Sequence, residues 1–301
     1  MAQVLSAPRA SASPCSQADR GFWPVDKVVL PYYGAVAIAV LVFWNRLTDP
    51  AILLAWHVGA ILIALFAIRS PGRFGCLFHH WYPLPYVAWC FHEMAVLMPS
   101  LRGWHADAAL ARIDHRLWGA DPAVWLERVS TPVLTEYLQI IYTLFVPAVL
   151  FIAVLLYWRR RYVEFRYYAF LIALGFLASY LGYVLVPARG PRFYFADLAG
   201  FPLRGLWFTH ALQLTLDRLE SKAWDCFPSG HTELTILAWW SSRAISNRLF
   251  WLYFVYTLSI ISATVYLRYH YTIDLLAGAV VAGLLVLFAP PLYRILRKGA
   301  A

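Results

Sequence analysis

The sequence predicts an all-α protein, a polytopic transmembrane bundle of about eight helical spans. Of its 301 residues, 61% are hydrophobic and only 14% are charged, whereas a soluble domain has about 25% charged residues. Aromatic residues make up 17% of the chain, which suits a protein whose Trp and Tyr side chains form belts at the two membrane interfaces. A water-soluble protein with a core this large would need a polar shell that the chain lacks.

Apolar runs recur along the chain, and a helix needs about 20 such residues to cross a bilayer. Eight runs are candidate spans: 28–45, 50–68, 82–98, 134–157, 166–186, 231–247, 249–268 and 272–289. The third and the sixth are short and contain polar residues, among them Glu93 and Glu233. Ionisable groups inside a membrane usually face a protein interior or a cavity. Glu233 is therefore either a site residue or a hydrogen-bonded packing residue.

The segments around the spans complete the predicted domain organisation. Residues 1–26 are rich in Ser, Ala and Pro and lack the apolar core of a cleaved signal peptide, so we expect a disordered cytoplasmic tail there. Residues 27–133 would form the first spans and an outer interfacial helix. Residues 134–290 would form the catalytic transmembrane domain, and residues 291–301 a second cytoplasmic tail.

The outer helix is expected within residues 105–130, which are too polar to span a membrane. Apolar residues recur there at helical spacing, and a glycine follows them: Leu110, Ile113, Leu117, Trp118 and Gly119. The pattern predicts an amphipathic helix that lies on the outer surface and ends at the glycine. The alternative is a solvated loop.

Short loops rich in Lys and Arg lie on the cytoplasmic side of a membrane. In an eight-span topology the arginine-rich loops 69–81, 158–165 and 243–248 lie on the same side as both termini. Both termini are therefore predicted to be cytoplasmic, and the long segments 99–133 and 187–230 to face the periplasm, the cell exterior or an organelle lumen. This orientation accounts for the net charge of +9, so no nucleic-acid partner is expected.

The first informative motif is Trp-Asp-Cys-Phe-Pro-Ser-Gly-His-Thr at residues 224–232, a turn of small residues directly before an apolar helix. Backbone N–H groups at the start of a helix form an anion site. Ser229 adds a hydroxyl donor, and Gly230 lets the backbone approach a phosphate. His231 would lie within reach of an anion bound there. An ordinary helix cap has the same composition, so a second feature is needed.

That feature is Arg-Tyr-His-Tyr-Thr-Ile-Asp at residues 268–274, in which His270 and Asp274 share one face of a helix. A carboxylate that accepts a proton from one imidazole nitrogen fixes the tautomer and leaves the other nitrogen free to attack. His231 opens one predicted span at the outer side, and the chain returns to that side at His270. The topology therefore predicts that the two histidines meet.

Arginines at the same face suit a phosphate ligand. Val-Pro-Ala-Arg-Gly-Pro-Arg at residues 186–192 ends the fifth predicted span and supplies Arg189 and Arg192, whose guanidinium groups match phosphate oxygens. Of these two, Arg192 is the stronger candidate. Arg268 stands at the end of a span, where it would contact either phosphate or lipid headgroups.

The motif Pro-Ser-Gly-His at 228–231, with His-Tyr-Thr-Ile-Asp-Leu-Leu-Ala-Gly at 270–278, resembles the type 2 phosphatidic acid phosphatase superfamily over roughly residues 134–290. Members of this family dephosphorylate lipid phosphates, or move phospho-headgroups between lipids, without a metal. The resemblance implies a six-helix core, a lipid phosphate substrate and no cofactor. It assigns these roles: His270 as nucleophile and phosphohistidine, Asp274 as its partner, His231 as leaving-group acid, and Ser229 and Gly230 as phosphate donors.

Two positions depart from the family pattern. The first family motif has a lysine seven positions before Arg-Pro, where this chain has Gly182 or Leu185 and then Pro191-Arg192. The third has an arginine six positions before its histidine, where this chain has Thr264 and an arginine at 268 instead. The variant set is similar to inositol phosphorylceramide synthases and sphingomyelin synthases. Transfer of a phospho-headgroup to a lipid or polyol hydroxyl is therefore the alternative to hydrolysis.

Two readings of other kinds use the same residues. A zinc or manganese site would take its ligands from His231, Glu233, His270 and Asp274, although the neighbouring arginines and N–H groups would repel a cation. A membrane transporter would contain broken helices near the membrane centre. Here the polar residues gather at helix ends on one face, which favours an interfacial enzyme.

Overall fold

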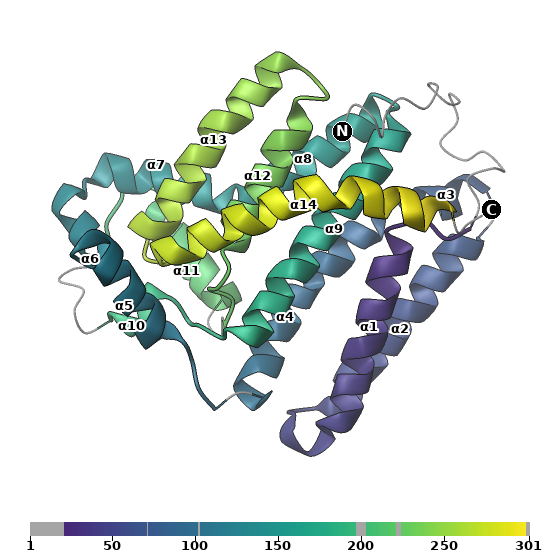
Figure 1. The fold of residues 1–301 in the computed structure, drawn as a ribbon, viewed down its shortest axis with the longest axis horizontal. Helices are drawn as coiled ribbons and strands as arrows, with labels where there is room; N and C mark the ends of the chain where they lie inside the picture. Colours follow the sequence, from purple (N-terminus) through teal and green to yellow (C-terminus); the bar gives the residue numbers. More distant parts are fainter. Residues whose placement is uncertain (1–20, 71, 102, 197–202, 221–223, 299–301) are drawn as a thin grey trace. The chain divides into compact units, whose positions relative to one another are not determined.

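The computed structural model describes most of the chain, and every regular element in the described part is a helix (Figure 1). The described ranges are 21–70, 72–101, 103–196, 203–220 and 224–298. The all-α class predicted from the sequence is therefore confirmed. Residues 1–20 of the predicted N-terminal tail and residues 299–301 of the predicted C-terminal tail lie outside the described residues.

The chain divides into two compact units, and both motifs lie in the second. Unit 1 comprises residues 1–93, 153–177 and 284–301, and unit 2 comprises residues 94–152 and 178–283. Four helices contribute residues to both units: α4 (Pro83–Leu101), α8 (Phe145–Trp158), α9 (Tyr162–Leu185) and α14 (Thr272–Lys298).

Unit 1 is built on a helical hairpin of α1 (Asp26–Val42) and α2 (Pro50–Arg69). Besides its parts of the shared helices, it also contains η2 (Trp44–Arg46) and α3 (Gly72–Trp81). The first residue of α1, Asp26, is fully buried and accepts hydrogen bonds from the Trp23 N–H at 2.6 Å, from His79 Nε2 at 2.8 Å and from the Tyr82 hydroxyl. This carboxylate ties the start of α1 to α3 and to the residue before α4.

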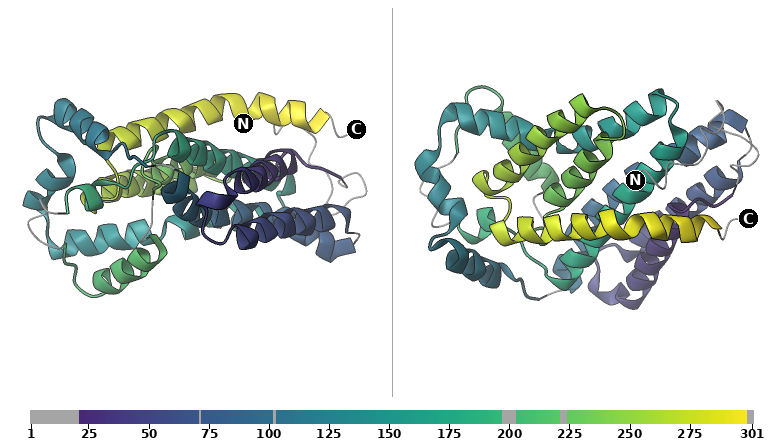
Figure 2. Two further views of the ribbon diagram at one scale, coloured as in Figure 1. Left: turned by 90° about the horizontal axis from the view of Figure 1, so that it is seen from below. Right: turned by 45° about the horizontal axis from the view of Figure 1, so that its top comes forward.

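Unit 2 holds the remaining helices: α5 (Asp107–Trp118), α6 (Pro122–Trp125), η3 (Leu126–Val129), α7 (Pro132–Thr143), α10 (Pro191–Tyr194), α11 (Thr209–Glu220), α12 (Gly230–Ser242) and α13 (Asn247–Tyr266). The green helices α12 and α13 lie side by side (Figures 1 and 2), and α13 also packs against α7. The starts of α12 and α14 are thereby brought to the same end of the α12–α13 pair.

Four described helices are long and apolar enough to cross a membrane: α2, α9, α13 and α14. A fifth span results if α7 and α8 are counted as one bent span, so the predicted number of eight is not confirmed. The helix α12 has 13 residues and is about 20 Å long at 1.5 Å per residue, short of the about 30 Å of a bilayer core.

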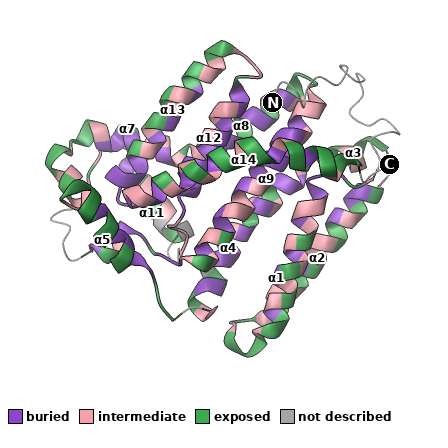
Figure 3. Ribbon diagram, in the orientation of Figure 1, coloured by how far each residue is buried: buried purple, intermediate pink, exposed green. Residues whose placement is uncertain are grey.

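Many residues of the candidate spans are exposed (Figure 3), and a large share of these exposed residues are apolar. Along α14, for example, Val280, Leu287 and Phe288 are all more than 60% exposed. An apolar surface of this kind would be costly in water and is stable against lipid tails. The described helices are therefore compatible with an integral membrane protein.

The run 134–157, predicted as one span, is broken into α7 and α8, which meet at 47°. Pro147 accounts for the break, because a continuous helix would need its missing N–H to bond the Thr143 carbonyl, and its ring would clash with that carbonyl. In the first turn of the new helix α8 the proline is tolerated. The break lies beside His231, as described below.

The predicted outer helix exists as α5 and ends as expected at Gly119, whose φ of 71° is in the left-handed region. Its apolar residues do not form a buried face. Leu110 is buried, whereas Ile113, Leu117 and Trp118 are exposed. The fully buried side chains on α5 include two aspartates, Asp107 and Asp114.

Candidate active site

Two loops bring the histidines of the two motifs into contact. His231 is the second residue of α12, and His270 lies in the link between α13 and α14. His231 Nδ1 is 3.3 Å from His270 Nε2. The His270 side chain is 4% exposed, and His231 is partly exposed. The two motifs therefore form one site within unit 2.

A backbone carbonyl fixes the tautomer of His270. Its Nδ1 is 2.9 Å from the carbonyl oxygen of Cys226, and a carbonyl can only accept a hydrogen bond. Nδ1 must therefore carry the proton, which leaves a lone pair on Nε2, the nitrogen that faces His231. Asp274 Oδ2 is also near Nδ1, at 3.4 Å. The carbonyl of Cys226 is thus the closer partner, and Asp274 supports it.

Asp274 is fully buried and holds the link around His270 together. Its Oδ2 accepts from the Tyr271 N–H at 2.8 Å and from the Cys226 thiol at 2.8 Å. Burial, and after it the charge of Asp274, raises the pKa of the Cys226 thiol well above its usual range. The thiol therefore stays protonated and acts as a donor to Asp274 rather than as a nucleophile.

Aromatic rings from the break between α7 and α8 fix the His231 ring. Tyr142 stacks on His231 with a centroid separation of 4.6 Å, and the Phe145 ring lies 4.3 Å away on a tilt. Tyr142 also stacks on Tyr269 at 4.2 Å. These residues were not predicted, because nothing in a continuous apolar run indicates which of its rings faces a site.

Ser229 and Gly230 form the turn before α12. The Ser229 hydroxyl is the N-cap of α12 and accepts from the Thr232 N–H at 3.3 Å, while the Ser229 N–H donates to the Asp274 carbonyl. A Cβ at position 230 would lie 2.8 Å from the Tyr183 hydroxyl, so glycine is required for packing as well as for any phosphate contact. The first N–H groups of a helix have no partner within it, which leaves this turn able to bind an anion.

The start of α14 packs directly on this turn. A Cβ at Gly278 would lie 2.5 Å from the Ser229 carbonyl oxygen, a distance that no side chain tolerates. Glycine at this position therefore allows the helix that contains Asp274 to approach the turn that precedes His231. The two motifs fit together as one packed unit.

The three arginines named from the sequence have different surroundings. The Arg192 guanidinium lies 4.7 Å from the Tyr269 ring centroid. Burial raises the pKa of the nearby Asp225, and His270 and Arg192 partly oppose this rise. Arg268 has a φ of 65° and donates to Glu127 at 2.5 Å. The contact with Glu127 was not predicted from the sequence. Arg189 is exposed and lies over the Phe193 ring. The Arg192 N–H donates to the Arg268 carbonyl at 2.8 Å, two residues before His270.

The proposed metal ligands are only partly brought together. In the described part of the chain, ligand atoms of Cys226, His270 and Asp274 lie within 4.8 Å of one another. Glu233 instead accepts from the Ser179 hydroxyl at 2.7 Å and is buried within unit 2. This hydrogen bond supports the packing role, one of the two roles considered for Glu233. These three side chains already contact one another, because the Cys226 thiol donates to Asp274 and Asp274 lies 3.4 Å from His270 Nδ1.

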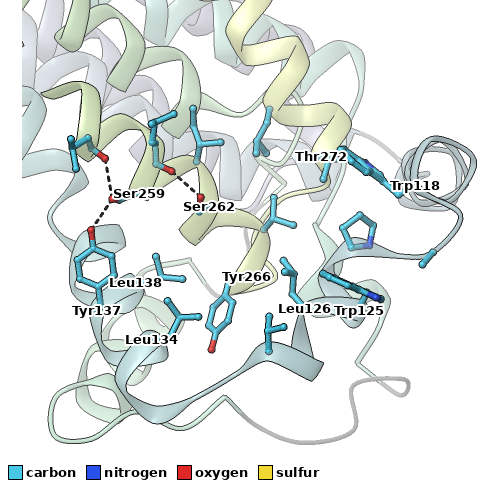
Figure 4. Close-up of a pocket in the computed structure, with 18 residues that line it drawn as sticks. Trp118, Trp125, Leu126, Leu134, Tyr137, Leu138, Ser259, Ser262, Tyr266 and Thr272 are labelled. Carbon is cyan, nitrogen blue, oxygen red and sulfur yellow. Dashed lines mark hydrogen bonds between the residues drawn. The ribbon is translucent and has the colours of Figure 1, made fainter. Parts of the chain in front are cut away.

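An apolar groove lies in unit 2, and Thr272, two residues after His270, is one of the residues that line it (Figure 4). It has a volume of about 970 Å³ and is lined by residues of α5, α6, η3, α7, α13 and the first turn of α14. Leu138 and Tyr266 line the groove and also pack in one cluster with Tyr142, the ring that stacks on His231. Tyr142 thus belongs both to the cluster that contains part of the groove wall and to the surroundings of His231.

Comparison with known proteins identifies the family. The model of the PAP2 superfamily matches residues 108–288, from the second residue of α5 through most of α14. The chain belongs to the PAP2 superfamily. Neither curated proteins nor solved structures give a match to this chain. Membership in the PAP2 superfamily supports an activity of the phosphatase or phosphotransferase type.

The PAP2 match begins upstream of the segment on which the resemblance was recognised, residues 134–290. It includes α5 from its second residue on, and with it the buried Asp114. This residue, like Glu127, makes long-range contacts in the structure that carry no local signal in the sequence.

Proposed function

We propose that this PAP2 superfamily protein is a metal-independent lipid phosphatase that forms a phosphohistidine at His270. The observation that carries the proposal is the hydrogen bond from His270 Nδ1 to the Cys226 carbonyl. It places the lone pair on Nε2, 3.3 Å from His231, where a nucleophile and a proton donor can act on the same phosphorus atom.

The reaction would run in two steps. In the first, His270 Nε2 forms a bond to phosphorus, the bond from phosphorus to the lipid oxygen breaks, and His231 gives its proton to that oxygen. In the second, water attacks the phosphohistidine, His231 takes a proton from the water, and phosphate leaves with restoration of the imidazole. Arg192, Arg268 and the N–H groups of the turn at Ser229 and Gly230 would stabilise the negative charge on the phosphoryl oxygens.

The groove supports a lipid as the substrate. It is lined mostly by apolar side chains and borders α13, a candidate span, so a hydrocarbon chain could lie in it while the phosphate is at the histidines. The basic loops favour an orientation with both termini in the cytoplasm and the site open to the periplasm, the exterior or a lumen. Within this proposal, residues 134–290 are the catalytic domain.

The burial of the site favours a second candidate. Because the His270 side chain is only 4% exposed, bulk water has limited access to a phosphohistidine. A lipid or polyol hydroxyl could then replace water in the second step, as the motif similarity to inositol phosphorylceramide and sphingomyelin synthases suggests. The products would be a new phospho-headgroup lipid and no free phosphate.

One assay separates these candidates. The purified protein in lipid nanodiscs is given a panel of lipid phosphates and headgroup donors in excess chelator, and both free phosphate and new lipids are measured. Free phosphate supports hydrolysis, and a new headgroup lipid supports transfer. Activity that disappears with chelator and returns with added zinc or manganese would instead support the cluster of Cys226, His270 and Asp274 as a metal site. Solute flux through the protein in liposomes, without either product, would support a transporter.

A further inference from the structure

We propose that Asp107 and Asp114 of α5 are positioning residues for His270. This inference rests on the proposed function, because it assumes that His270 is the nucleophile. Both aspartates are buried, with exposures of 0% and 2%. They are seven residues apart, two turns of helix, and therefore lie on the same face of α5.

Asp114 binds the first turn of α14. Its Oδ2 accepts from the Thr272 N–H at 2.7 Å, and its Oδ1 accepts from the Thr272 hydroxyl at 2.8 Å and the Ile273 N–H at 2.9 Å. These N–H groups have no partner within their own helix, and a negative charge at the start of a helix is favoured by its dipole. Asp114 thus acts as a cap supplied by another helix, and it fixes the backbone two residues after His270.

Asp107 binds the residue next to His270 and the loop before α10. Its Oδ1 accepts from the Tyr271 hydroxyl at 2.9 Å and from the Gly190 N–H at 2.8 Å, and its Oδ2 accepts from the Arg189 N–H at 3.0 Å. The loop continues into Arg192, whose N–H donates to the Arg268 carbonyl. Asp107 therefore joins both segments that approach the histidines.

The two aspartates hold Tyr271 and Thr272, the two residues that directly follow His270. The N–H groups of residues 267–270 donate to backbone carbonyls at the end of α13, and the two aspartates fix the residues that follow this link. Catalysis depends strongly on such placement, since a displacement of 1 Å can lower a rate about 100-fold. The face of α5 that binds the site is therefore its acidic face, and its role is to place the His270 ring.

The test compares Asp114→Asn with Asp121→Asn in the full-length protein in nanodiscs. Asp121 follows α5 in the same segment and pairs only loosely with His115, at 3.4 Å on the surface. In Asp114→Asn an amide NH2 replaces an acceptor oxygen opposite backbone N–H groups. We expect its kcat and its rate of phosphohistidine formation to fall about 10-fold to 100-fold, with KM changed less than threefold. Asp121→Asn should match the parent protein. Equal kcat values in the two variants would overturn the inference.

A milder variant guards against a failure to fold. Tyr271→Phe removes only the hydroxyl that donates a hydrogen bond to Asp107. It should lower kcat without lowering the midpoint of thermal unfolding by more than a few degrees. In a double-mutant cycle with Asp107→Asn, the effects on kcat should be less than additive, because both substitutions remove one contact. Additive effects, or a loss of stability in proportion to the loss of kcat, would indicate a purely structural role.

A further arm separates this inference from the proposed function. If His270→Ala keeps full turnover, the proposed nucleophile is wrong. Deuterium exchange in residues 268–276 then still tests the contact, since Asp114→Asn should increase uptake there and Asp121→Asn should not. If His270→Ala is inactive while Asp114→Asn has normal kcat and normal uptake, the proposed function stands and the positioning role is wrong.

Discussion

At the scale of single residues, the reactivity of His270 depends on which of its nitrogens carries the proton. From the four-residue spacing of His270 and Asp274, we predicted that Asp274 determines which nitrogen is protonated. The structure places the carbonyl of Cys226 closer, at 2.9 Å, and Asp274 at 3.4 Å. A backbone carbonyl carries no residue identity, so no pattern of side chains could have predicted it.

Because His270 Nδ1 has both the Cys226 carbonyl and Asp274 as partners, the effect of Asp274→Asn can be predicted. The Cys226 carbonyl still holds the proton on Nδ1, but the contacts to the Tyr271 N–H and the Cys226 thiol are weakened. We expect kcat to fall about 10-fold to 100-fold, less than the about 10⁴-fold fall seen where a carboxylate alone sets the tautomer of a histidine. Steady-state kinetics with the preferred lipid phosphate measure it. A loss as complete as that of His270→Ala would show that Asp274 is the essential partner.

The role of His231 predicts a dependence on the leaving group. His231→Ala removes the proton donor, so cleavage of a lipid phosphate, whose alkoxide is a poor leaving group, should slow about 10²-fold to 10⁴-fold. Cleavage of p-nitrophenyl phosphate needs no proton donor and should slow far less. Circular dichroism of the variant should match the parent protein, because the partly exposed ring makes mainly stacking contacts. Equal losses for both substrates would contradict the assignment.

At the scale of helices, the sequence predicted which runs are helical better than where they bend and what they face. The break between α7 and α8 escaped detection because the apolar run is continuous, although Pro147 lies within it. The buried acidic side of α5 also escaped detection. Spacing shows which residues share a face, but Asp114 finds its N–H donors 158 residues further along the chain, and only the folded arrangement reveals that these donors make the acidic face the buried one.

The groove between α7 and α13 gives a prediction at this scale. Leu258 lines the groove and is 50% exposed, whereas Leu252, on the same helix, is 64% exposed and lies outside it. Leu258→Trp should occupy part of the groove and raise KM for long-chain substrates about tenfold, the loss expected for about two buried CH2 groups. KM for a short-chain analogue should change little.

Leu252→Trp is the matched control, because it adds the same side chain at an exposed position of α13 outside the groove. It should leave both KM values near those of the parent protein. An unchanged KM for the long-chain substrate in Leu258→Trp would exclude the groove as the site of the hydrocarbon chain.

At the scale of the whole molecule, composition and the recurrence of apolar runs were sufficient to predict an all-α membrane protein. The number of spans was not predictable in the same way. The helices α4 and α12 contain Glu93 and Glu233, which the structure buries, so a run of apolar residues that packs inside a protein cannot be distinguished by hydropathy from one that contacts lipid.

The orientation inferred from the basic loops is open to direct test. Arg160 and Trp207 are both exposed and lie in segments predicted on opposite sides of the membrane. In sealed cells a membrane-impermeant maleimide should label Trp207→Cys, and it should label Arg160→Cys only after the membrane is opened. The parent protein provides the background of the native cysteines. The reverse labelling pattern would place the site on the cytoplasmic side.

The most direct test of the central claim is rapid quenching of the enzyme with a radiolabelled lipid phosphate, in chelator, followed by identification of the labelled atom. The account predicts an acid-labile, alkali-stable phosphohistidine at residue 270, attached at Nε2, and no label in His270→Ala. Turnover without any covalent intermediate, a label on another residue, or attachment at Nδ1 would contradict it.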